Sequence, residues 1–353
     1  MSYGNFKDPF GLLKRMLASG NKAAYFTLLR EGMSLLLKPV DALWQSSERK
    51  KIRNAKSSKL PLIIILGGSR SGTTILYQTL AHYLPVSYFN NLSASFPRSP
   101  ISSAGFFKSW FRKKTSNKKF SNYYGSVSGF NGPNDGFHIW NRWLGDDRNS
   151  IPEVLSAEVI GEMQSFFNAW HERMREPFLN KNNRNSLCVD LFRAAFEHIH
   201  FVEIRRNPLY VVQSLIQSRE AVQGDKYIGW GLATKDSSDS KEAYAYIKDI
   251  CEQVKAVETT LDEARSRVPE GQYTYFSYED FCEDPSSVLT EIYQKAWPID
   301  APKLKLDGIK AFKNTNRQKL GDEEFQAILD HLQPLYNEKQ FAQIMSQTAL
   351  IKA

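Results

Sequence analysis

From residue 60 onward, short apolar runs alternate with longer stretches in which apolar residues recur every three or four positions. The short runs predict β-strands and the amphipathic stretches predict α-helices. The predicted strands are Leu62–Leu66, Leu187–Val189, Phe201–Ile204 and Tyr273–Ser277. The predicted helices are Thr73–Leu84, Val154–Arg175, Leu209–Arg219, Ser240–Val268, Pro285–Trp297 and Asp322–Leu335. This alternation predicts an α/β domain with a central, largely parallel sheet flanked by helices.

Before this domain, residues 9–44 place apolar side chains at helical spacing among lysines and arginines, and Pro39 is expected to break the pattern. Two interpretations stay open: the helices pack on the domain with their cations in water, or they lie in a membrane interface. Ser47–Lys59 predicts a basic, poorly ordered linker. The expected division is a helical extension with linker (1–59), a domain (60–340) with a variable insertion at about 90–150, and a C-terminal tail (341–353).

A second basic stretch, Gly105–Phe120, contains six Lys or Arg residues and no acid. Its aromatic residues include Phe106, Phe107, Trp110 and Phe111. It is either a solvated loop with one buried aromatic cluster or a contact site for anionic lipid or an acidic glycan. A membrane surface is therefore a candidate partner of residues 1–59 and 105–120.

The charge of the chain is distributed unevenly. Of 353 residues, the first 59 hold 12 Lys or Arg and 4 Asp or Glu, so they account for the whole net charge of +8. Because the rest is neutral and has no recognition motif, nucleic acid is not an expected partner. Three scattered cysteines, no apolar leader and no apolar run near the ~20 residues of a membrane span indicate a cytoplasmic protein, associated at most with the inner face of a membrane. The histidines have no other potential metal ligands beside them at the spacing of a metal site, so no metal is expected.

The first candidate site follows the strand at Leu62–Leu66. There the pattern Gly67-x-x-x-x-Gly72 leads into Thr73 and Thr74 at the start of a predicted helix. Backbone N–H groups of such a loop, together with the helix dipole, bind anions. In the common nucleotide loop a lysine follows the second glycine, but here Thr73 stands there and the nearby cation is Arg70. With no clear strand-ending Asp for Mg²⁺ either, the apparatus for phosphoryl transfer is incomplete.

The second candidate site follows the strand at Phe201–Ile204. Arg206 lies at the strand exit, Pro208 takes the first helical position, and Ser214 comes eight residues after the arginine. Since the carboxyl ends of parallel strands meet at one edge of a sheet, the two turns predict a site for a ligand with two separate anionic groups.

Three segments resemble the sulfotransferases that use 3′-phosphoadenosine 5′-phosphosulfate, of the P-loop type found in bacteria. They are GGSRSGTTIL (67–76), similar to the 5′-phosphosulfate loop, RNPLYVVQS (206–214), similar to the 3′-phosphate motif, and YTYFSYEDFCEDPSSVLTEIY (273–293), similar to the strand and helix that follow. Their order and separation agree over roughly Leu60–Leu335. The resemblance implies the phosphosulfate donor as cofactor and 3′,5′-ADP as product.

The resemblance also implies roles for residues. The residues that would hold the 5′-phosphosulfate are Gly68, Ser69, Arg70, Ser71, Gly72, Thr73 and Thr74. Arg206 and Ser214 would hold the 3′-phosphate, and Tyr278 would lie near the adenine. A looser match over Phe312–Phe325 implies contacts from Asn314, Asn316 and Arg317. Arg70 would also stabilise the leaving group.

The general base is less evident. Cytosolic animal members of that family carry Lys-x-His after the second strand, whereas the segment predicted as this strand is followed by Asp190. Gly129–Gly145, rich in Gly, Asn and Trp, offers Asp135 and His138, so these two are the first candidates and Asp190 is the reserve. The alternative is that neither residue is catalytic: His138 has a structural role and Asp135 is a turn residue.

The acceptor is expected to be a glycan, a glycolipid, a hydroxylated lipid or another small molecule. Aromatic residues suggest a stacking surface for it: Tyr123, Tyr124, Phe130, Trp140 and Trp143. Two other functions stay open beside sulfate transfer. One is a P-loop nucleotide kinase, which Thr73 in the lysine position disfavours. The other is a non-catalytic, membrane-associated protein that binds anions.

Overall fold

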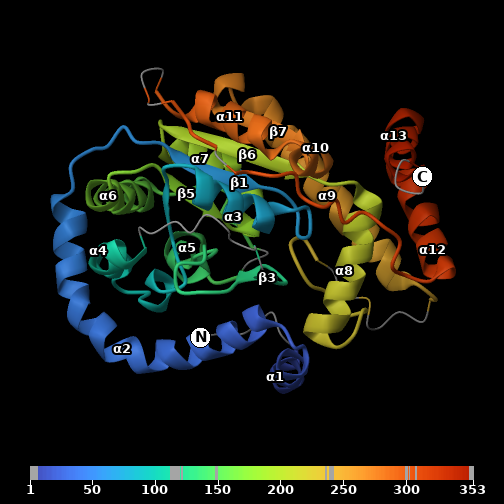
Figure 1. Ribbon diagram of the computed structural model, residues 1–353, viewed down its shortest axis with the longest axis horizontal. Coiled ribbons are helices and arrows are strands. Elements are labelled where there is room, and N and C mark those ends of the chain that lie inside the picture. Colours follow the sequence, from blue (N-terminus) through green and yellow to red (C-terminus); the bar gives the residue numbers. More distant parts are fainter. Residues whose placement is uncertain are drawn as a thin grey trace.

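The structure is a computed structural model that describes residues 7–111, 120, 122–147, 150–234, 237, 242–298, 301, 303–306 and 308–349. At its centre lies a five-stranded sheet in the order β2-β5-β1-β6-β7, with every neighbouring pair parallel (Figure 1). The strands are β1 Leu62–Leu66, β2 Ser87–Tyr88, β5 Phe178–Lys181, β6 Ile199–Arg205 and β7 Tyr273–Ser277. The expected parallel sheet flanked by helices is confirmed.

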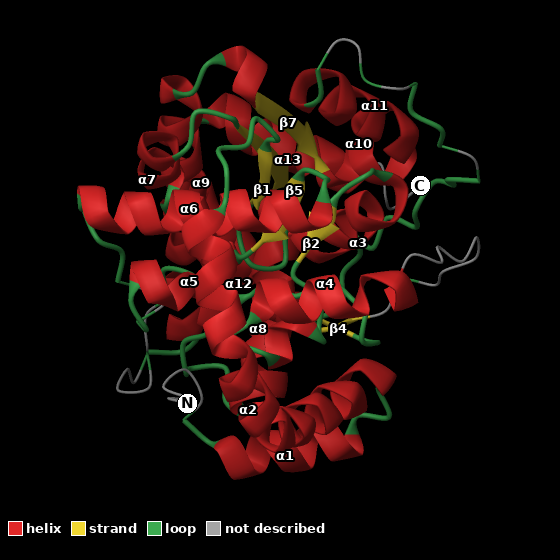
Figure 2. Cartoon of the chain, turned by 90° about the vertical axis from the view of Figure 1, so that its left-hand side faces the viewer, coloured by secondary structure: helices red, strands yellow, loops and turns green. Residues whose placement is uncertain are grey.

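Alternation along β1 builds two cores. Leu62, Ile64 and Leu66 point to one face of the sheet, and Ile63 and Ile65 point to the other. Residues of α5 Phe137–Leu144, α6 Ala157–Met174 and α7 Val189–Ala195 join the first core. Residues of α3 Thr73–Tyr83, α10 Tyr278–Glu283 and α11 Pro285–Ala296 join the second. Helices cover both faces, as in Figure 2.

A third core lies beyond the carboxyl end of β6. It unites α8 Pro208–Gln223 and α9 Ala245–Arg267 with α12 Asp322–Leu332 and α13 Glu338–Ala349. The side chain of Asn207 donates a hydrogen bond to the Ile344 carbonyl (2.8 Å), so the last helix is fixed beside the exit of β6. Most of the described part of the expected C-terminal tail is therefore helical.

The remaining short elements lie in the insertion and the loops. They are α4 Pro100–Phe111, the antiparallel pair β3 Asn122–Tyr123 and β4 Ser126–Val127, and the 3₁₀ turns η1 Ser93–Ser95, η2 Asn183–Leu187, η3 Glu270–Gln272 and η4 Gln333–Leu335. The basic stretch at Gly105–Phe120 begins inside α4, and residues 112–119 lie outside the described part of the chain. The rings of both Phe106 and Phe107 contact Trp44, and Phe106 is nevertheless largely exposed.

Two helices precede the sheet, α1 Pro9–Ala18 and α2 Lys22–Asn54. The expected break at Pro39 and the expected linker from Ser47 are both wrong, because α2 continues through them. The reason is tertiary contact. Asp41 and Glu48, both buried, accept hydrogen bonds from backbone N–H groups at the start of α4. Among the described residues, no helix combines the length and hydropathy needed to cross a membrane.

The second predicted strand was also wrong. Leu187 ends the turn η2 and Val189 begins α7, whereas the strand beside β1 is Phe178–Lys181. Its polar half hid it from the apolar pattern. Asn180 and Lys181 are buried because Asn180 accepts a hydrogen bond from Trp140 (2.9 Å) and Lys181 pairs with Asp135.

Candidate functional site

The loop between β1 and α3 has a conformation that its glycines permit. Gly67 and Gly72 have φ of 149° and 101°, and Arg70 between them has φ of 71°. A Cβ atom on Gly72 would lie 2.6 Å from the ring of Tyr278. The hydroxyl of Ser186 accepts a hydrogen bond from the Gly67 N–H (2.9 Å) and donates one to the Gly67 carbonyl (3.1 Å). Ser186 therefore fixes the start of the loop by bonding both the N–H and the carbonyl of Gly67.

The start of α3 offers backbone donors. The first helical hydrogen bond runs from the Leu76 N–H to the Gly72 carbonyl, so the N–H groups of Thr73 to Ile75 have no partner within the helix. Gly72 has no side chain to cap them. The left-handed residues that precede the helix turn successive N–H groups toward one region. This end of α3 is built to bind an anion.

Two arginines meet beside the loop. Arg70 donates a hydrogen bond from Nε to Ser214 (2.9 Å), and its guanidinium lies 5.2 Å from the ring centre of Tyr124. Arg206 donates to the carbonyl of Arg70 (3.3 Å) and lies 4.9 Å from the ring centre of Tyr278. Thus the structure brings together the loop, the exit of β6 and Tyr278, as the sequence motifs required.

The loosely matched C-terminal segment also reaches this place. Arg206 donates to Asn316 Oδ1 (2.7 Å) and to the hydroxyl of Thr315 (3.3 Å). Asn314 accepts a hydrogen bond from the Asn316 N–H (2.9 Å), which shapes the turn. The side chain of Gln213 donates to the Arg317 carbonyl (2.9 Å) and holds the following residues on α8.

The cations of this site are not neutralised by protein carboxylates. Burial, and then the charge of Arg206, lower the pKa of the Arg70 guanidinium. Burial and the charges of three arginines lower the pKa of the Lys319 ammonium; they are Arg206, Arg317 and Arg70. Among the described residues, no carboxylate lies within ion-pair distance of Arg70 or Arg206. Mutual repulsion in a half-buried cluster indicates that a ligand supplies the negative charge.

The neighbouring Arg205 shows the opposite situation. It forms ion pairs with Glu203, which is fully buried, and with Asp262 (2.9 Å). Although burial disfavours the charge, these carboxylates raise the pKa of Arg205 above its usual value. Arg205 is thus paired with carboxylates within the fold. Burial lowers the pKa of Arg206 although Tyr278 and the charge of Glu279 act in the opposite direction, and Arg206 has hydrogen-bond partners but no described carboxylate within ion-pair distance.

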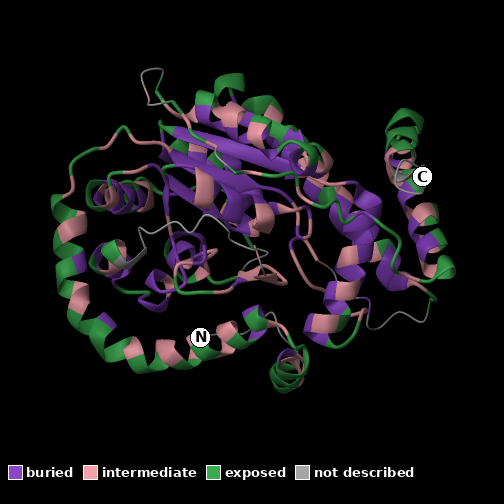
Figure 3. Ribbon diagram, in the orientation of Figure 1, coloured by how far each residue is buried: buried purple, intermediate pink, exposed green. Residues whose placement is uncertain are grey.

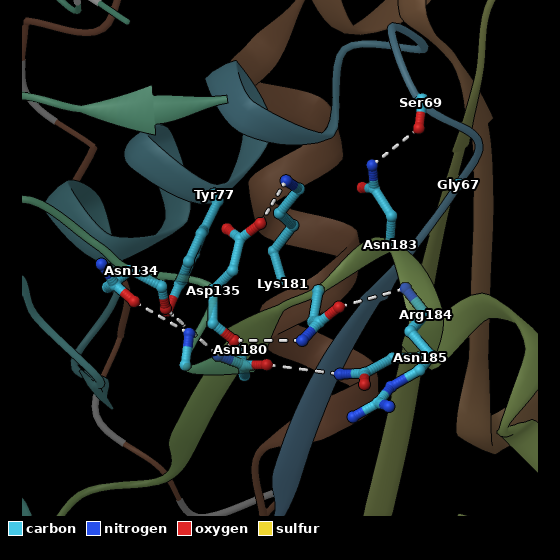
Figure 4. Close-up of polar contacts among 12 residues, drawn as sticks. Gly67, Ser69, Tyr77, Asn134, Asp135, Asn180, Lys181, Asn183, Arg184 and Asn185 are labelled. Atoms are coloured by element: carbon cyan, nitrogen blue, oxygen red, sulfur yellow. Dashed lines mark hydrogen bonds and ion pairs between the residues drawn. The ribbon is translucent and has the colours of Figure 1, made fainter. Parts of the chain in front are cut away.

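A second polar group lies on the other side of α3 (Figure 4). Lys181, at the end of β5, forms an ion pair with Asp135 (3.0 Å), and Figure 4 shows these two side chains pointing toward each other. A Cβ atom on Gly125 would lie 3.9 Å from Lys181 Nζ and 4.0 Å from Thr74 Oγ1. The ion pair therefore lies close to the first turn of α3, beside the anion site.

Asn183 connects this group to the loop. Its Nδ2 donates a hydrogen bond to the hydroxyl of Ser69 (2.9 Å), while its buried Oδ1 has no hydrogen-bond partner among the residues that the structure describes. An amide oxygen in this situation needs a donor from solvent or ligand. Lys181 is the last residue of β5, and Asn182 and Asn183 come directly after it. In the Lys-x-His pattern, Lys181 therefore corresponds to the lysine and Asn183 to the histidine. The misplaced strand concealed this signal.

The other base candidates lie elsewhere. His138, in the first turn of α5, is exposed. Asp190, in the first turn of α7, is exposed and pairs with Arg267 (2.7 Å) and Arg193 (3.7 Å). Asp135 accepts a hydrogen bond from Lys181 at the end of β5, next to the loop (3.0 Å).

The expected aromatic surface is only partly correct. Trp140 and Trp143 are buried in the first core, because α5 packs these side chains against α6 and the sheet. The ring of Tyr124, on the β3–β4 turn, lies over the guanidinium of Arg70, and the ring of Tyr123 packs against the ring of Tyr124. Phe130 packs edge-on against Phe26. Within the described part of the chain, no group of three or more His, Cys, Asp or Glu side chains is arranged to hold a metal ion.

Comparison with known proteins gives a family and a fold. A family model described as "Sulfotransferase family" matches residues 61–296, more than half of the chain. The structure is similar to the sulfotransferase STF9 from Mycobacterium avium, with a TM-score of 0.51, 14% identity, and coverage of 87% of this chain and 79% of that chain. It is also similar to the sulfotransferase STF1 from Mycobacterium tuberculosis H37Rv, with a TM-score of 0.49, 13% identity, and coverage of 93% and 87%. No curated protein matches the sequence.

Proposed function

The chain belongs to the sulfotransferase family, and from this premise we propose that it transfers a sulfuryl group from 3′-phosphoadenosine 5′-phosphosulfate to a hydroxyl or amine of an acceptor. The proposed catalytic domain spans residues 60–340. The observation that carries the proposal is the adjacent pair of guanidinium groups, Arg70 and Arg206, with which no carboxylate among the described residues forms an ion pair. One group lies in the loop between β1 and α3, and the other lies at the exit of β6. This arrangement suits a nucleotide that carries anionic groups at both the 3′ and the 5′ positions of its ribose.

The residues fit this donor in the following way. Arg206, Asn316 and the loop around them would hold the 3′-phosphate, with Asn314 and Arg317 completing that loop. The 5′ end would lie against the backbone N–H groups of residues 68–74, and Tyr278 would flank the base. Ser214 binds Arg70 in the structure, so its proposed part is to orient that guanidinium as much as to contact phosphate. Lys319 and Thr315 join the site as additional residues.

When bound, the donor supplies an activated sulfuryl group: the acceptor oxygen or nitrogen bonds to sulfur, the bond from sulfur to the bridging phosphate oxygen breaks, and 3′,5′-ADP leaves. Arg70 and the N–H groups at Thr73 and Thr74 would stabilise the charge that develops on the leaving oxygen. A loop with fixed backbone donors and the permanent cation of Arg70 would stabilise this charge without the lysine of the common nucleotide loop.

Asp135 is our proposed general base, and it is favoured over His138 and Asp190 by its contact with Lys181. It would take the proton of the acceptor while Lys181, buried beside it, holds the carboxylate in place and faces the leaving group. The free Oδ1 of Asn183 would accept a hydrogen bond from the acceptor and orient it. The proposed acceptor is a glycan, a glycolipid or a hydroxylated lipid.

The donor is tested by thermal unfolding with 3′,5′-ADP, ADP or Mg·ATP. A ligand of the folded state adds about 2.7 kcal/mol of stability at a hundred times its Kd. We expect stabilisation by 3′,5′-ADP and little by the other two. Stabilisation by Mg·ATP alone would replace this proposal with the nucleotide kinase.

The base is tested by single-turnover transfer of labelled sulfate to three alcohols: a monosaccharide glycoside, a glycosyl diacylglycerol and a long-chain fatty alcohol. Asp135→Asn and Lys181→Met should slow transfer at least about a hundredfold, the usual contribution of a positioned base. His138→Ala and Asp190→Ala are the matched controls and should retain the wild-type rate. A wild-type rate in Asp135→Asn would eliminate Asp135. Absence of transfer to any alcohol by a protein that binds 3′,5′-ADP would favour the non-catalytic anion-binding function.

A further inference from the structure

The outer surfaces of α1 and α2 are apolar. On α1, Phe10, Leu13 and Leu17 are exposed at spacings of three and four residues, so they share one face. On α2 a longer row recurs at spacings of three, four and seven: Tyr25, Leu29, Leu36, Val40 and Leu43. Leu36 and Leu43 expose 79% and 78% of their surface. We call these eight residues the outer row.

The face of α2 that packs on the domain is mixed. Ala23 and Ala24 are buried and Trp44 stacks on Phe96, and two buried acids lie on the same side of the helix. Glu48 accepts hydrogen bonds from the N–H groups of Ile101 and Ser102 (2.8 Å each). Asp41, seven residues earlier, accepts one from the hydroxyl of Ser99 (2.7 Å). The helix therefore attaches to the domain through its acids as well as through apolar contacts, while Leu29, Leu36 and Leu43 remain exposed. Figure 3 shows exposed positions along α1 and α2.

The charges beside the outer row are positive. The exposed ionisable residues of the two helices are Lys14, Lys22, Lys38, Arg49, Lys50 and Arg53. Of the acids in these helices, Asp41 and Glu48 are buried and Glu31 is half-buried and paired with Arg30 (2.6 Å). The outer surface thus combines an apolar row with cations and exposes no acid between residues 9 and 54.

The same helices form part of the wall around the acceptor side of the site. Arg30 donates a hydrogen bond to Asn91 Oδ1 (3.0 Å), and Asn91 donates from Nδ2 to the Val127 carbonyl on β4 (2.8 Å). The turn between β3 and β4 carries Tyr124, which covers Arg70, and Gly125, which lies close to Lys181 and Thr74. One layer of protein, the β3–β4 pair, separates α2 from the catalytic loop.

We propose that the outer row and its flanking cations bind the surface of an anionic lipid bilayer, with α1 and α2 lying along the interface. Leucine, tyrosine and phenylalanine would enter the boundary between headgroups and acyl chains, and the lysines and arginines would meet anionic headgroups. A second copy of the chain fits less well, because the exposed charges of this surface are all positive and any two-fold contact of the surface with itself sets cations against cations. The companion statement, that the acceptor is drawn from this bilayer, rests on the proposed function.

The test is co-sedimentation of the full chain with vesicles of phosphatidylcholine alone or with about one-third phosphatidylglycerol, where each nearby cation contributes about 1 kcal/mol. We expect binding to the anionic vesicles, weakened at high salt. Leu36→Ser with Leu43→Ser should reduce the partition coefficient about tenfold or more. Lys38→Gln with Lys50→Gln removes two cations, about 2 kcal/mol, and should reduce it about thirtyfold. Val154→Ser, an exposed apolar residue outside these helices, is the matched control and should change nothing.

Three outcomes would overturn the proposal: no binding of the wild type to anionic vesicles, equal binding to neutral vesicles, or unchanged binding in the leucine variant. A wild-type dimer that the leucine variant converts to a monomer, without vesicle binding, would assign the row to a second copy instead. Thermal stabilisation by 3′,5′-ADP, measured on the same proteins, reports the donor site separately. Failure of the membrane proposal and failure of the proposed function are therefore distinguishable.

Discussion

Arg205 and Arg206 are adjacent in sequence but differ in their partners, so replacing each with methionine should separate folding from nucleotide binding. Arg205 neutralises Glu203, which is fully buried. In Arg205→Met, Glu203 keeps only Arg265 (3.6 Å) and the hydroxyl of Tyr273 (2.5 Å). Breaking a buried ion pair costs about 3–5 kcal/mol, and because Arg265 remains we expect about 3 kcal/mol of lost stability. The affinity of the folded protein for 3′,5′-ADP should stay unchanged.

Arg206→Met should do the reverse. The unliganded protein loses the hydrogen bonds of Arg206 to Asn316, Thr315 and the Arg70 carbonyl, but it also loses the repulsion that lowers the pKa values of Arg70 and Lys319. These effects oppose each other, so stability should change by less than about 1 kcal/mol. Each charge-assisted hydrogen bond to phosphate is worth about 1.5–3 kcal/mol, so 3′,5′-ADP should bind about a hundredfold more weakly.

Urea unfolding gives the stability of each unliganded variant, and titration calorimetry gives the Kd of 3′,5′-ADP. ADP, which lacks the 3′-phosphate, is the matched ligand control: its weak binding should be the same in wild type and Arg206→Met. The reasoning is refuted by either of two results. One is an equal loss of 3′,5′-ADP affinity in both variants. The other is a loss of about 3 kcal/mol in the unliganded Arg206→Met protein.

Three further changes have defined outcomes. Gly72→Ala, with φ of 101° and a Cβ 2.6 Å from a tyrosine ring, should cost about 1–3 kcal/mol and abolish stabilisation by 3′,5′-ADP in thermal unfolding, whereas Gly161→Ala, in open space on a helix, should be neutral or stabilising. Burial lowers the pKa of His171 from 6.5 to about 4, so between these pH values unfolding takes up a proton and the free energy of unfolding decreases as the pH falls. In His171→Leu, the free energy of unfolding measured in urea should therefore fall by about 1.4 kcal/mol less per pH unit in this range than in the wild type. Glu48→Ala leaves the start of α4 without acceptors and should cost about 2–3 kcal/mol by the same measurement, whereas Glu31→Ala, at a half-exposed pair, should cost less than about 1 kcal/mol.

The donor side of the site was readable from the sequence because its determinants are local. The loop at Gly67–Gly72 and the turn at Arg206 each follow an apolar strand and precede a helix, so spacing alone predicts where the backbone donors and the cations lie. Parallel strands then bring the two turns to one edge of the sheet. Even the C-terminal segment around Asn316, matched only loosely, reaches Arg206.

The failures all involve residues whose structure depends on distant partners. Pro39 does not end α2, because buried contacts of Asp41 and Glu48 with α4 hold the helix on the domain beyond it. The strand at Phe178–Lys181 escaped notice because half of it is polar, and its burial depends on Trp140 and Asp135 from another segment. No local pattern contains this information.

The same distinction explains why the family resemblance suggests a donor, which remains our proposal, but leaves the acceptor open. Lys181 and Asn183 follow β5, Asp135 precedes α5, and Tyr124 lies on the β3–β4 turn, so the acceptor side is assembled from three separate segments. Two of these belong to the insertion at about 90–150, where α2 also packs. Because the proposed base, the aromatic cover and the outer row are supplied by this insertion and the helices beneath it, acceptor choice can change there without altering the loop that we propose holds the donor.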